Sequence, residues 1–378
     1  MKILIAADSF KNALDSLRVC RAIERGLNKG NPLIQTQCFP MADGGEGTID
    51  ILAYHLGGKK RELMAVDPLF RPIKTDYLIS EDGKTVFIEM AKTSGLQLLI
   101  EKERNPLLTT TFGLGKIILD AINLGIKNII LAIGGSATND AGIGMATALG
   151  YKFYDKDHLQ LKGIGEDLLR IIKIEISAEN QQLLSDVSFS VICDVRNPLY
   201  GPEGASHIYC RQKGATDDDI LLLDKGLKKL ADVTNQSALA STEGAGAAGG
   251  LGFGAMAFLN ATLYRGIDLI IDITHFEQHV LSSDIIITGE GKLDNQTSHG
   301  KLIYGITTCA SKYNKPVIAL CGSIDITPEY TTKLGLQAAF SIIKKPCNLN
   351  QAIAETEKDL EAAAFNIAQI LSLKTIIR

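Results

Sequence analysis

The chain has 378 residues, of which 46% are hydrophobic and 22% are charged, and its formal net charge at pH 7 is −4. This length is enough for two or three domains with substantial cores. The slight acidic excess gives no electrostatic reason to expect nucleic acid or an anionic membrane as a partner.

Cysteine usage and the N-terminal segment both indicate a cytoplasmic protein. The seven cysteines stand far apart with no C-x-x-C pair, which is typical of free thiols in a reducing compartment. The apolar run 3–7 is too short for a signal peptide and favours a β-strand. The uncharged stretch 244–264 is too rich in glycine for a membrane span, so it predicts a Gly-rich loop that leads into a buried helix.

Short runs rich in Ile, Val and Leu alternate with helical patterns, which is typical of α/β architecture. The first part of the chain predicts strand 2–7, helix 14–30, strand 35–39, helix 48–57, a hairpin over 74–90, helix 111–125 and strand 127–133. The remainder predicts strands 187–193, 284–288, 316–321 and 337–343, and helices 301–313, 327–335 and 350–371.

From this order we expect an α/β fold with two dissimilar α/β lobes and a cleft between them. Residues 1–62 and 265–378 would form a Rossmann-like α/β domain built from both chain ends. Residues 63–264 would form an inserted mixed α/β domain.

Four segments carry the polar chemistry: 8–11, which has no glycine, and the Gly-rich segments 43–47, 134–140 and 289–297. Each joins a predicted strand to the start of a helix, and ligands bind at this carboxyl edge in open α/β sheets. Glycine lets backbone N–H groups approach an anion, and a helix N-terminus adds partial positive charge.

The first two segments combine acids with a cation or with glycines. Lys11 offers a positive charge to a phosphate or a carboxylate, while Asp8, next to Ser9, is able to hold a metal or a hydroxyl. The alternative is a helix cap with a solvated lysine. The second segment sets two carboxylates beside exposed amides, an arrangement that suits Mg²⁺ with phosphate oxygens, although a tight turn is the alternative. Its residues are Asp43, Gly44, Gly45, Glu46 and Gly47.

The third segment is similar in kind to a phosphate-binding loop, and a plain strand-to-helix turn is the alternative. It is not a Walker A motif, since none occurs in the chain. Its candidate residues are Gly134, Gly135, Ser136, Thr138, Asn139 and Asp140. The fourth segment is the densest polar cluster, with the acids and the lysine that a kinase needs, and a surface loop is the alternative. Its candidates are Glu290, Lys292, Asp294 and Gln296.

Three further features of the sequence bear on its chemistry. Asp194 ends an apolar strand, where a charge must be paired, metal-bound or exposed at the edge. The run 244–249 matches G-x-G-x-x-G without a preceding strand, so it predicts close packing or a hinge rather than dinucleotide binding. His275 and His279 indicate a surface pair rather than a zinc site.

Taken in order, these motifs resemble the bacterial glycerate kinase type 1 family. The stretches 104–111, 193–199, 212–216 and 244–252 support the resemblance, which covers nearly the whole chain. It implies ATP-dependent phosphorylation of D-glycerate, with the 2-phosphate favoured over the 3-phosphate, on a fold of two dissimilar α/β lobes. The implied cofactors are ATP and Mg²⁺. The implied partners are glycerate and ATP, without nucleic acid or membrane, and a homo-oligomer is left open.

Under that resemblance each cluster receives a role. Asp194 and Glu290 would bind Mg²⁺, and Asp294 would orient or deprotonate the acceptor hydroxyl. Lys11 and Lys292 would neutralise the transferred phosphate or the substrate carboxylate. The segments 43–47 and 134–140 would hold phosphates or glycerate, and which of them holds which is left open.

Three small departures from the family pattern, at Ala7, Ala141 and Arg196, and two rival functions remain. Ala141 stands where the family often has glycine, and alanine is tolerable there if the local φ is ordinary. Arg196 lies two residues from Asp194 and changes the charge there, so the details of substrate binding at this point are left open. The rivals are a kinase for another small hydroxy acid on the same fold and a non-catalytic metabolite-binding protein. The metabolite-binding protein is disfavoured because binding alone does not need carboxylates placed to hold a metal ion.

Overall fold

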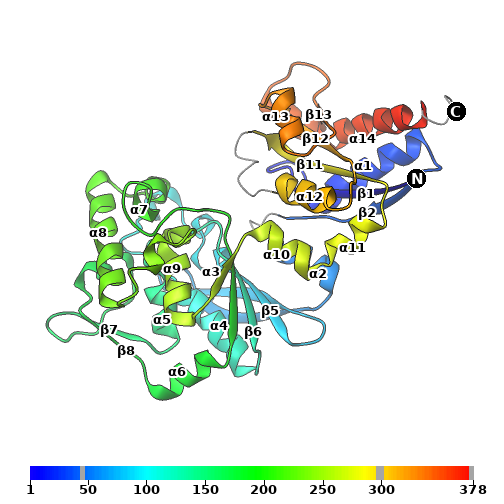
Figure 1. Cartoon of the computed structure of the whole chain (residues 1–378). Helices are drawn as coiled ribbons and strands as arrows, with labels where there is room; N and C mark the ends of the chain where they lie inside the picture. The colour runs from blue at the N-terminus through cyan, green and yellow to red at the C-terminus, as the bar shows by residue number, and fades with distance from the viewer. Residues whose placement is uncertain (43–46, 295–301, 374–378) are drawn as a thin grey trace. The chain divides into compact units, whose positions relative to one another are not determined.

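The structure, a computed structural model of the whole chain, describes residues 1–42, 47–294 and 302–373 (Figure 1). The chain divides into two compact units. The first unit is Met1–Asp43 with Gly266–Arg378, and the second unit is Gly44–Arg265. In the described residues, every helix is too short or too polar to span a bilayer.

The first unit contains both chain ends and a five-stranded sheet in the order β13-β12-β11-β1-β2, in which all neighbours are parallel. Its strands are β1 (Lys2–Ala7), β2 (Gln35–Cys38), β11 (Ile285–Leu293), β12 (Val317–Ile324) and β13 (Ala338–Ser341). Its helices are α1 (Ser16–Gly30), α10 (Gly266–Ile273), α11 (Phe276–Leu281), α12 (Leu302–Ser311), α13 (Pro328–Lys333) and α14 (Leu349–Leu373).

The strand order of the first unit has a point where the chain reverses direction across the sheet. From β1 the chain goes to β2 on one side, and it returns to β11, β12 and β13 on the other side. This is the 2-1-3-4-5 order of doubly wound sheets, whose ligands bind outside the carboxyl ends of the strands at the reversal. The topology therefore points to the ends of β1 and β11.

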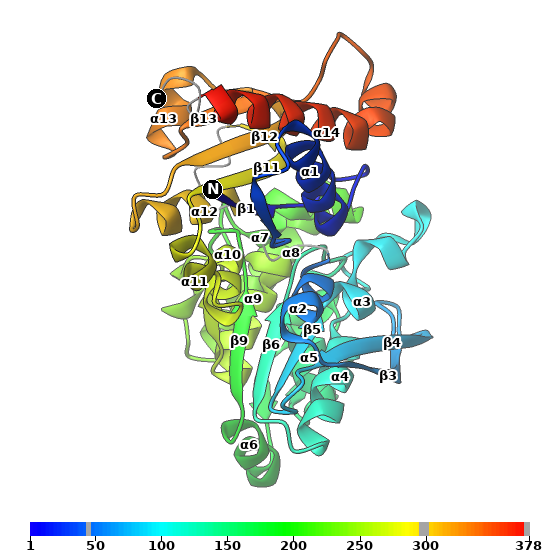
Figure 2. The same cartoon turned by 90° about the vertical axis from the view of Figure 1, so that its right-hand side faces the viewer.

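Helices α1 and α14 lie side by side on one face of this sheet (Figures 1 and 2). Alternate residues Ile3 and Ile5 of β1 share a buried cluster with Ile23 of α1 and Leu360 of α14, as the period of two in a strand requires. A Cβ at Gly26 would lie 2.2 Å from the carbonyl oxygen of Glu361, so the two helix backbones approach closely. Helix α12 contacts β11 and β12.

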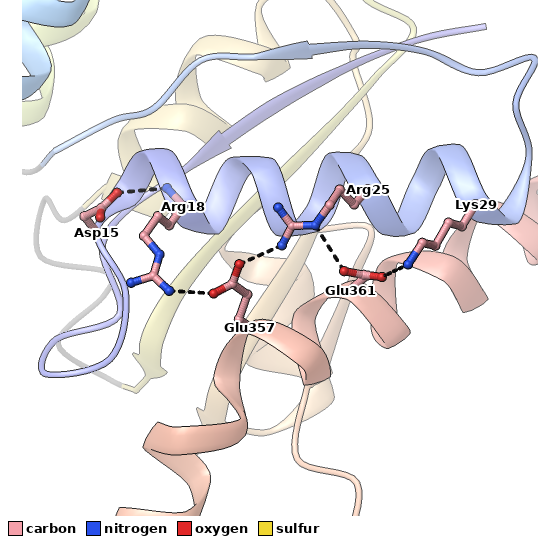
Figure 3. Close-up of polar contacts among 6 residues, drawn as sticks. All are labelled: Asp15, Arg18, Arg25, Lys29, Glu357 and Glu361. Carbon is pink, nitrogen blue, oxygen red and sulfur yellow. Dashed lines mark hydrogen bonds and ion pairs between the residues drawn. The ribbon is translucent and has the colours of Figure 1, made fainter.

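Five charged side chains connect α1 to α14 along their exposed edge (Figure 3). Glu357 accepts from Arg18 at 2.6 Å and from Arg25 at 2.8 Å. Glu361 accepts from Arg25 at 3.1 Å and also pairs with Lys29. Lys29 and Arg25 lower the pKa of Glu361, and Arg18 and Arg25 lower the pKa of Glu357.

The double variant Glu357→Gln/Glu361→Gln is expected to lose about 1–2 kcal/mol of unfolding free energy at pH 7. The loss is small because each exposed ion pair contributes little. The two carboxylates have depressed pKa values in the folded protein, so their stabilisation is present above the ordinary value of 4.5 and is lost as pH falls through the folded value. Denaturant midpoints should therefore converge for wild type and variant as the pH falls below 4.5.

The control is Glu355→Gln, which breaks one exposed pair with Lys358 on the same helix. It should change the midpoint much less at every pH. A difference between wild type and the double variant that does not shrink as the pH falls below 4.5 would show that the carboxylate charges are not its source.

The second unit is built around a six-stranded mixed sheet in the order β10-β9-β6-β5-β4-β3, in which β3, β4 and β5 pair antiparallel and the rest parallel (Figure 2). Its strands are β3 (Lys59–Val66), β4 (Pro72–Ile79), β5 (Thr85–Glu89), β6 (Asn128–Ala132), β9 (Ser188–Ile192) and β10 (Thr262–Tyr264), with the separate pair β7 (Lys152–Tyr154) and β8 (Lys173–Glu175). Its helices are α2 (Thr48–Leu56), α3 (Ala91–Ser94), α4 (Phe112–Asn123), α5 (Ile143–Ala148), α6 (Ala178–Ser185), α7 (Ala205–Tyr209), α8 (Asp217–Val233) and α9 (Ala247–Leu259).

Most predicted elements are confirmed to within a few residues, including the hairpin, which is β4 and β5. Two features differ. The division after Asp43 lies well before the predicted boundary at residue 62, because β3 pairs with β4 and α2 contacts β5. The prediction that residues 289–293 form a loop is wrong, because β11 continues to Leu293 by pairing with β12.

The run 244–249 was expected to serve in close packing or as a hinge, and it packs closely. A Cβ at Gly246 would lie 2.2 Å from the carbonyl oxygen of Pro198, and one at Gly249 would lie 2.0 Å from that of Thr138. The amide of Ala141 donates to the carbonyl of Gly249 at 3.0 Å. The glycines therefore let the start of α9 lie against the segment 134–140.

Candidate functional site

The structure brings the first and fourth predicted segments together in the first unit. The amide of Asp8 donates to the carbonyl of Gly289 at 2.9 Å. A Cβ at Gly291 would lie 3.9 Å from the backbone nitrogen of Lys11. The two segments meet because β1 and β11 are parallel neighbours, and they meet at the chain reversal where doubly wound sheets bind ligands.

One face of β11 is polar along its second half. Ile287 belongs to the cluster with α1 and α14, so the alternate residues Thr288, Glu290 and Lys292 face the opposite side of the sheet. Glu290 is 7% exposed and lies opposite Cys321 of β12, whose thiol pKa is raised by burial to about 12. The Oγ1 of Thr288 is buried without a hydrogen-bond partner in the described residues.

Lys292 is held between two acids. Its Nζ lies 3.3 Å from Asp294 and 3.4 Å from Asp325, and hydrogen bonds to these two carboxylates raise the lysine pKa. Asp325 follows the end of β12 and was missed by the sequence reasoning, although the strand predicted over 316–321 pointed to this edge. The lysine therefore stays charged at neutral pH, as charge neutralisation requires.

The segment that follows β1, with the candidates Asp8, Ser9 and Lys11, lies beside this cluster. Lys11 is exposed, while Asp8 and Ser9 are half-buried. The amide of Ser9 donates to Asp8 Oδ1 at 2.7 Å. Asp43, Gly44, Gly45, Glu46 and Gln296 lie outside the described residues.

The carboxylates fit a magnesium ion that arrives with a nucleotide better than a preformed metal cage. In the described parts of the chain, no three His, Cys, Asp or Glu side chains form a metal-binding group, the histidines at 275 and 279 included. Magnesium in phosphoryl-transfer sites needs only one or two carboxylates, because phosphate oxygens and waters complete its shell. Glu290, near the chain reversal, is able to supply one such carboxylate.

In the second unit the segment 134–140 is divided into an exposed and a buried half. Gly134 and Gly135 are exposed, whereas Ser136 is 8% exposed and Thr138 and Asn139 are fully buried. Asn139 Nδ2 donates to Ser206 Oγ at 3.2 Å. The side chains of Thr138 and Asn139 therefore hold the segment in place, and Gly134 and Gly135 are its exposed residues.

Asp140 also supports the segment from inside. Its carboxylate accepts from the backbone nitrogen and Oγ1 of Thr111, both at 2.7 Å, and from the amides of Gly142 and Gly144. Burial raises the pKa of Asp140. Ala141 has φ +48°, so the condition of an ordinary φ that would make alanine tolerable there is not met.

Two residues of the second unit were missed as site candidates. Lys213 is 2% exposed and donates from Nζ to Ser136 Oγ at 3.0 Å and to the carbonyl of Thr138 at 2.7 Å. Glu89 ends β5 and accepts from the amide of Ile49 at 3.3 Å, and burial raises its pKa. The only sequence signal for Lys213 was its place in the supporting stretch 212–216.

The other predicted residues of the second unit lie at the same edge of its sheet. Asp194 is exposed two residues beyond the end of β9, as its place after an apolar strand suggested. Gly47 directly precedes α2. Arg196 lies 3.7 Å from Glu243, and both side chains are more than half exposed. Asp194 and Glu290 belong to different units, so their joint metal binding stays a prediction.

A model of the glycerate kinase family matches residues 3–372 of this sequence. The chain belongs to the glycerate kinase family. It is 41% identical over 375 residues to a glycerate kinase of Bacillus cereus, covering 98% of each chain. It is 40% identical over 376 residues to the glycerate 2-kinase of Escherichia coli K12, covering 99% of this chain and 98% of that one.

A solved structure agrees with this membership. A crystal structure of a Salmonella typhimurium LT2 protein, proposed to be a glycerate kinase 2, matches with a TM-score of 0.87 and 39% identity over 99% of both chains. The family resemblance expected from the motifs is confirmed, and the relatives named here are kinases.

Proposed function

We propose that the protein transfers the γ-phosphoryl group of Mg·ATP directly to the 2-hydroxyl of D-glycerate in the cytoplasm. The observation that carries the proposal is the meeting of segments 8–11 and 289–294 at the chain reversal of a doubly wound sheet. Membership of the glycerate kinase family supplies the substrate class. The absence of a Walker A motif fits a kinase outside the P-loop class.

The proposed roles follow from the environment of each residue. Phosphoryl transfer depends mainly on positioning and charge stabilisation. Asp294 orients the glycerate hydroxyl or accepts its proton, and Lys292 neutralises the transferred phosphoryl group. Glu290 and Asp194 are the candidate carboxylates for Mg²⁺, directly or through water, and the ion would supply further charge neutralisation on the phosphates.

The regiochemistry rests on Lys11. This exposed lysine is proposed to bind the glycerate carboxylate close to the transferred group. The 2-hydroxyl is adjacent to that carboxylate, whereas the 3-hydroxyl lies one carbon further away. A carboxylate held near the phosphoryl group therefore presents the 2-hydroxyl, and a cation between the two anions reduces their repulsion.

The proposal predicts that purified protein with ATP, Mg²⁺ and D-glycerate releases ADP and forms 2-phosphoglycerate. A coupled ADP assay measures turnover, and phosphorus NMR identifies the product. Formation of 3-phosphoglycerate alone would contradict the proposed orientation of glycerate. The protein would still be a glycerate kinase.

A panel of small hydroxy acids in the same assay tests the two rivals. Turnover with another hydroxy acid but not with glycerate would favour the kinase of different specificity. No ADP release with any acid, from protein that still binds ATP, would favour a metabolite-binding protein.

A further inference from the structure

Lys213 is a buried cation without an acidic partner in the described residues. It ends the short turn 211–213, and its Nζ donates to the neutral oxygens of Ser136 and Thr138, with the Cys210 thiol close enough to act on its pKa. No carboxylate of the described chain lies within 4.0 Å of it. The nearby Asp140 is already used by Thr111 and by two backbone amides.

This arrangement is unfavourable for the empty protein. Burial penalises the charged ammonium, and it lowers the pKa of Lys213. An apolar side chain of similar size at such a position is often neutral or stabilising. Fold stability alone therefore does not explain a lysine here, whereas a counter-ion brought by a ligand does.

The surroundings of Lys213 suit an anion. Ser136, which accepts from Lys213, directly follows the exposed Gly134 and Gly135. A Cβ at Gly135 would meet only the Cβ of Ala91, at 3.6 Å, so the backbone there is open to a ligand. In a medium of low dielectric, the positive charge of Lys213 would attract an anion bound at this backbone without touching it.

The backbone of a second basic residue, Arg104, lies against the turn that carries Lys213. The carbonyl oxygen of Arg104 would be 2.1 Å from a Cβ at Gly214, so its backbone lies against the residue that follows Lys213. The Nε of Arg104 is buried and has no hydrogen-bond partner in the described residues. A buried donor without an acceptor is costly unless a ligand supplies one.

We propose that Lys213 supplies the counter-charge of an anion site at Gly134, Gly135 and Ser136, which takes a phosphate or carboxylate group of a ligand. Lys213 is a positioning residue, since it acts through Ser136 and through its field. The inference rests on the proposed function for the names of the two sources, the phosphates of the nucleotide and the carboxylate of glycerate.

The test measures the thermal midpoint of the full chain against inorganic phosphate, with chloride at matched ionic strength as reference. A bound ligand raises the midpoint according to its concentration and Kd. Lys213→Met and Lys213→Gln are each expected to weaken the apparent Kd for phosphate by at least about tenfold, because a positive charge at short range in a low dielectric is lost. Without phosphate, Lys213→Met should melt at or above the wild-type midpoint.

Arg211→Met is the matched control, because it removes one positive charge from an exposed position on the same turn, where Arg211 pairs with Asp217. It should keep the wild-type response to phosphate. Lys213→Gln keeps a donor for Ser136 while removing the charge, so it decides the matter even if Lys213→Met does not fold. A wild-type response in Lys213→Gln would overturn the proposal, as would equal losses in Lys213→Met and Arg211→Met.

Repeating the titration with ADP and with D-glycerate separates the two sources. The ligand whose stabilisation is lost in Lys213→Gln is the one that occupies the site. The phosphate response does not require turnover, so it would survive in a protein without glycerate kinase activity. Conversely, the wild type could be active while Lys213→Gln binds phosphate, ADP and glycerate normally. That result would refute the anion site and leave the proposed function intact.

Discussion

Replacement of Asp294 by asparagine is expected to lower kcat for glycerate by about a hundredfold or more, in the range of lost general-base assistance. The substitution keeps the size of the side chain and removes its capacity to take a proton from the acceptor hydroxyl. Asp294 is 21% exposed at the side chain and lies 3.3 Å from Lys292, so it combines access with a fixed position. Because the lost interaction belongs to the transition state, kcat and kcat/KM should fall together.

Asp325→Asn is the matched control. Asp325 lies 3.4 Å from the same Nζ of Lys292, but its side chain is 75% exposed. Its replacement should change kcat by less than about threefold, as for most surface substitutions. Equal losses in both variants would assign the effect to the charge balance around Lys292 and would remove the role proposed for Asp294.

Replacement of Gly249 by alanine is expected to lower the free energy of unfolding of the second unit by about 2–5 kcal/mol, from backbone strain and overpacking together. The residue has φ +68°, and the new Cβ would lie 2.0 Å from the carbonyl oxygen of Thr138 and 2.6 Å from the Cα of Asn139. Both are backbone atoms, so the segment 134–140 must shift. Denaturant unfolding measures the loss, and the apparent Kd for phosphate should weaken with it.

Gly125→Ala separates the two contributions. Gly125 has φ +83°, but no atom lies within 4 Å of the position a Cβ would take. Its replacement therefore tests the strain of the left-handed backbone alone, which is about 1–2 kcal/mol. If the two variants lose the same stability, the close approach between Gly249 and Thr138 contributes nothing and the expected displacement of the segment is wrong.

Local pattern was sufficient for most of the fold. The alternation of apolar runs with helical periodicity predicted β1, α1, the hairpin β4–β5 and the long α14, because each has a strong signal of its own. The extension of β11 to Leu293 was missed, because Gly289 and Gly291 indicate a loop in isolation. Pairing with β12, more than 25 residues later, keeps that stretch extended.

The candidate site was predicted unevenly for a similar reason. Polar residues after predicted strands, such as Asp8 and Asp294, could be nominated because strand ends meet at one edge of a sheet. Lys213 could not, because it comes from a short turn and its burial depends on contacts with Ser136 and Thr138, over 70 residues away in the sequence. Sequence also gave no means of telling that Asp140 faces the interior while Gly134 faces solvent.

The discontinuous first unit has a consequence for the order of folding during synthesis. β1 and α1 leave the ribosome first, but β11 and α14, which cover Ile5 and Ile23, come from the far end of the chain. The second unit, made in between, has all its sheet partners within itself. At about 5–20 residues per second, the N-terminal apolar faces wait for tens of seconds, and a growing chain in that state is open to aggregation or to chaperone binding. Nascent chains stalled before residue 285 should therefore hold a protease-resistant second unit and a cleavable N-terminal segment.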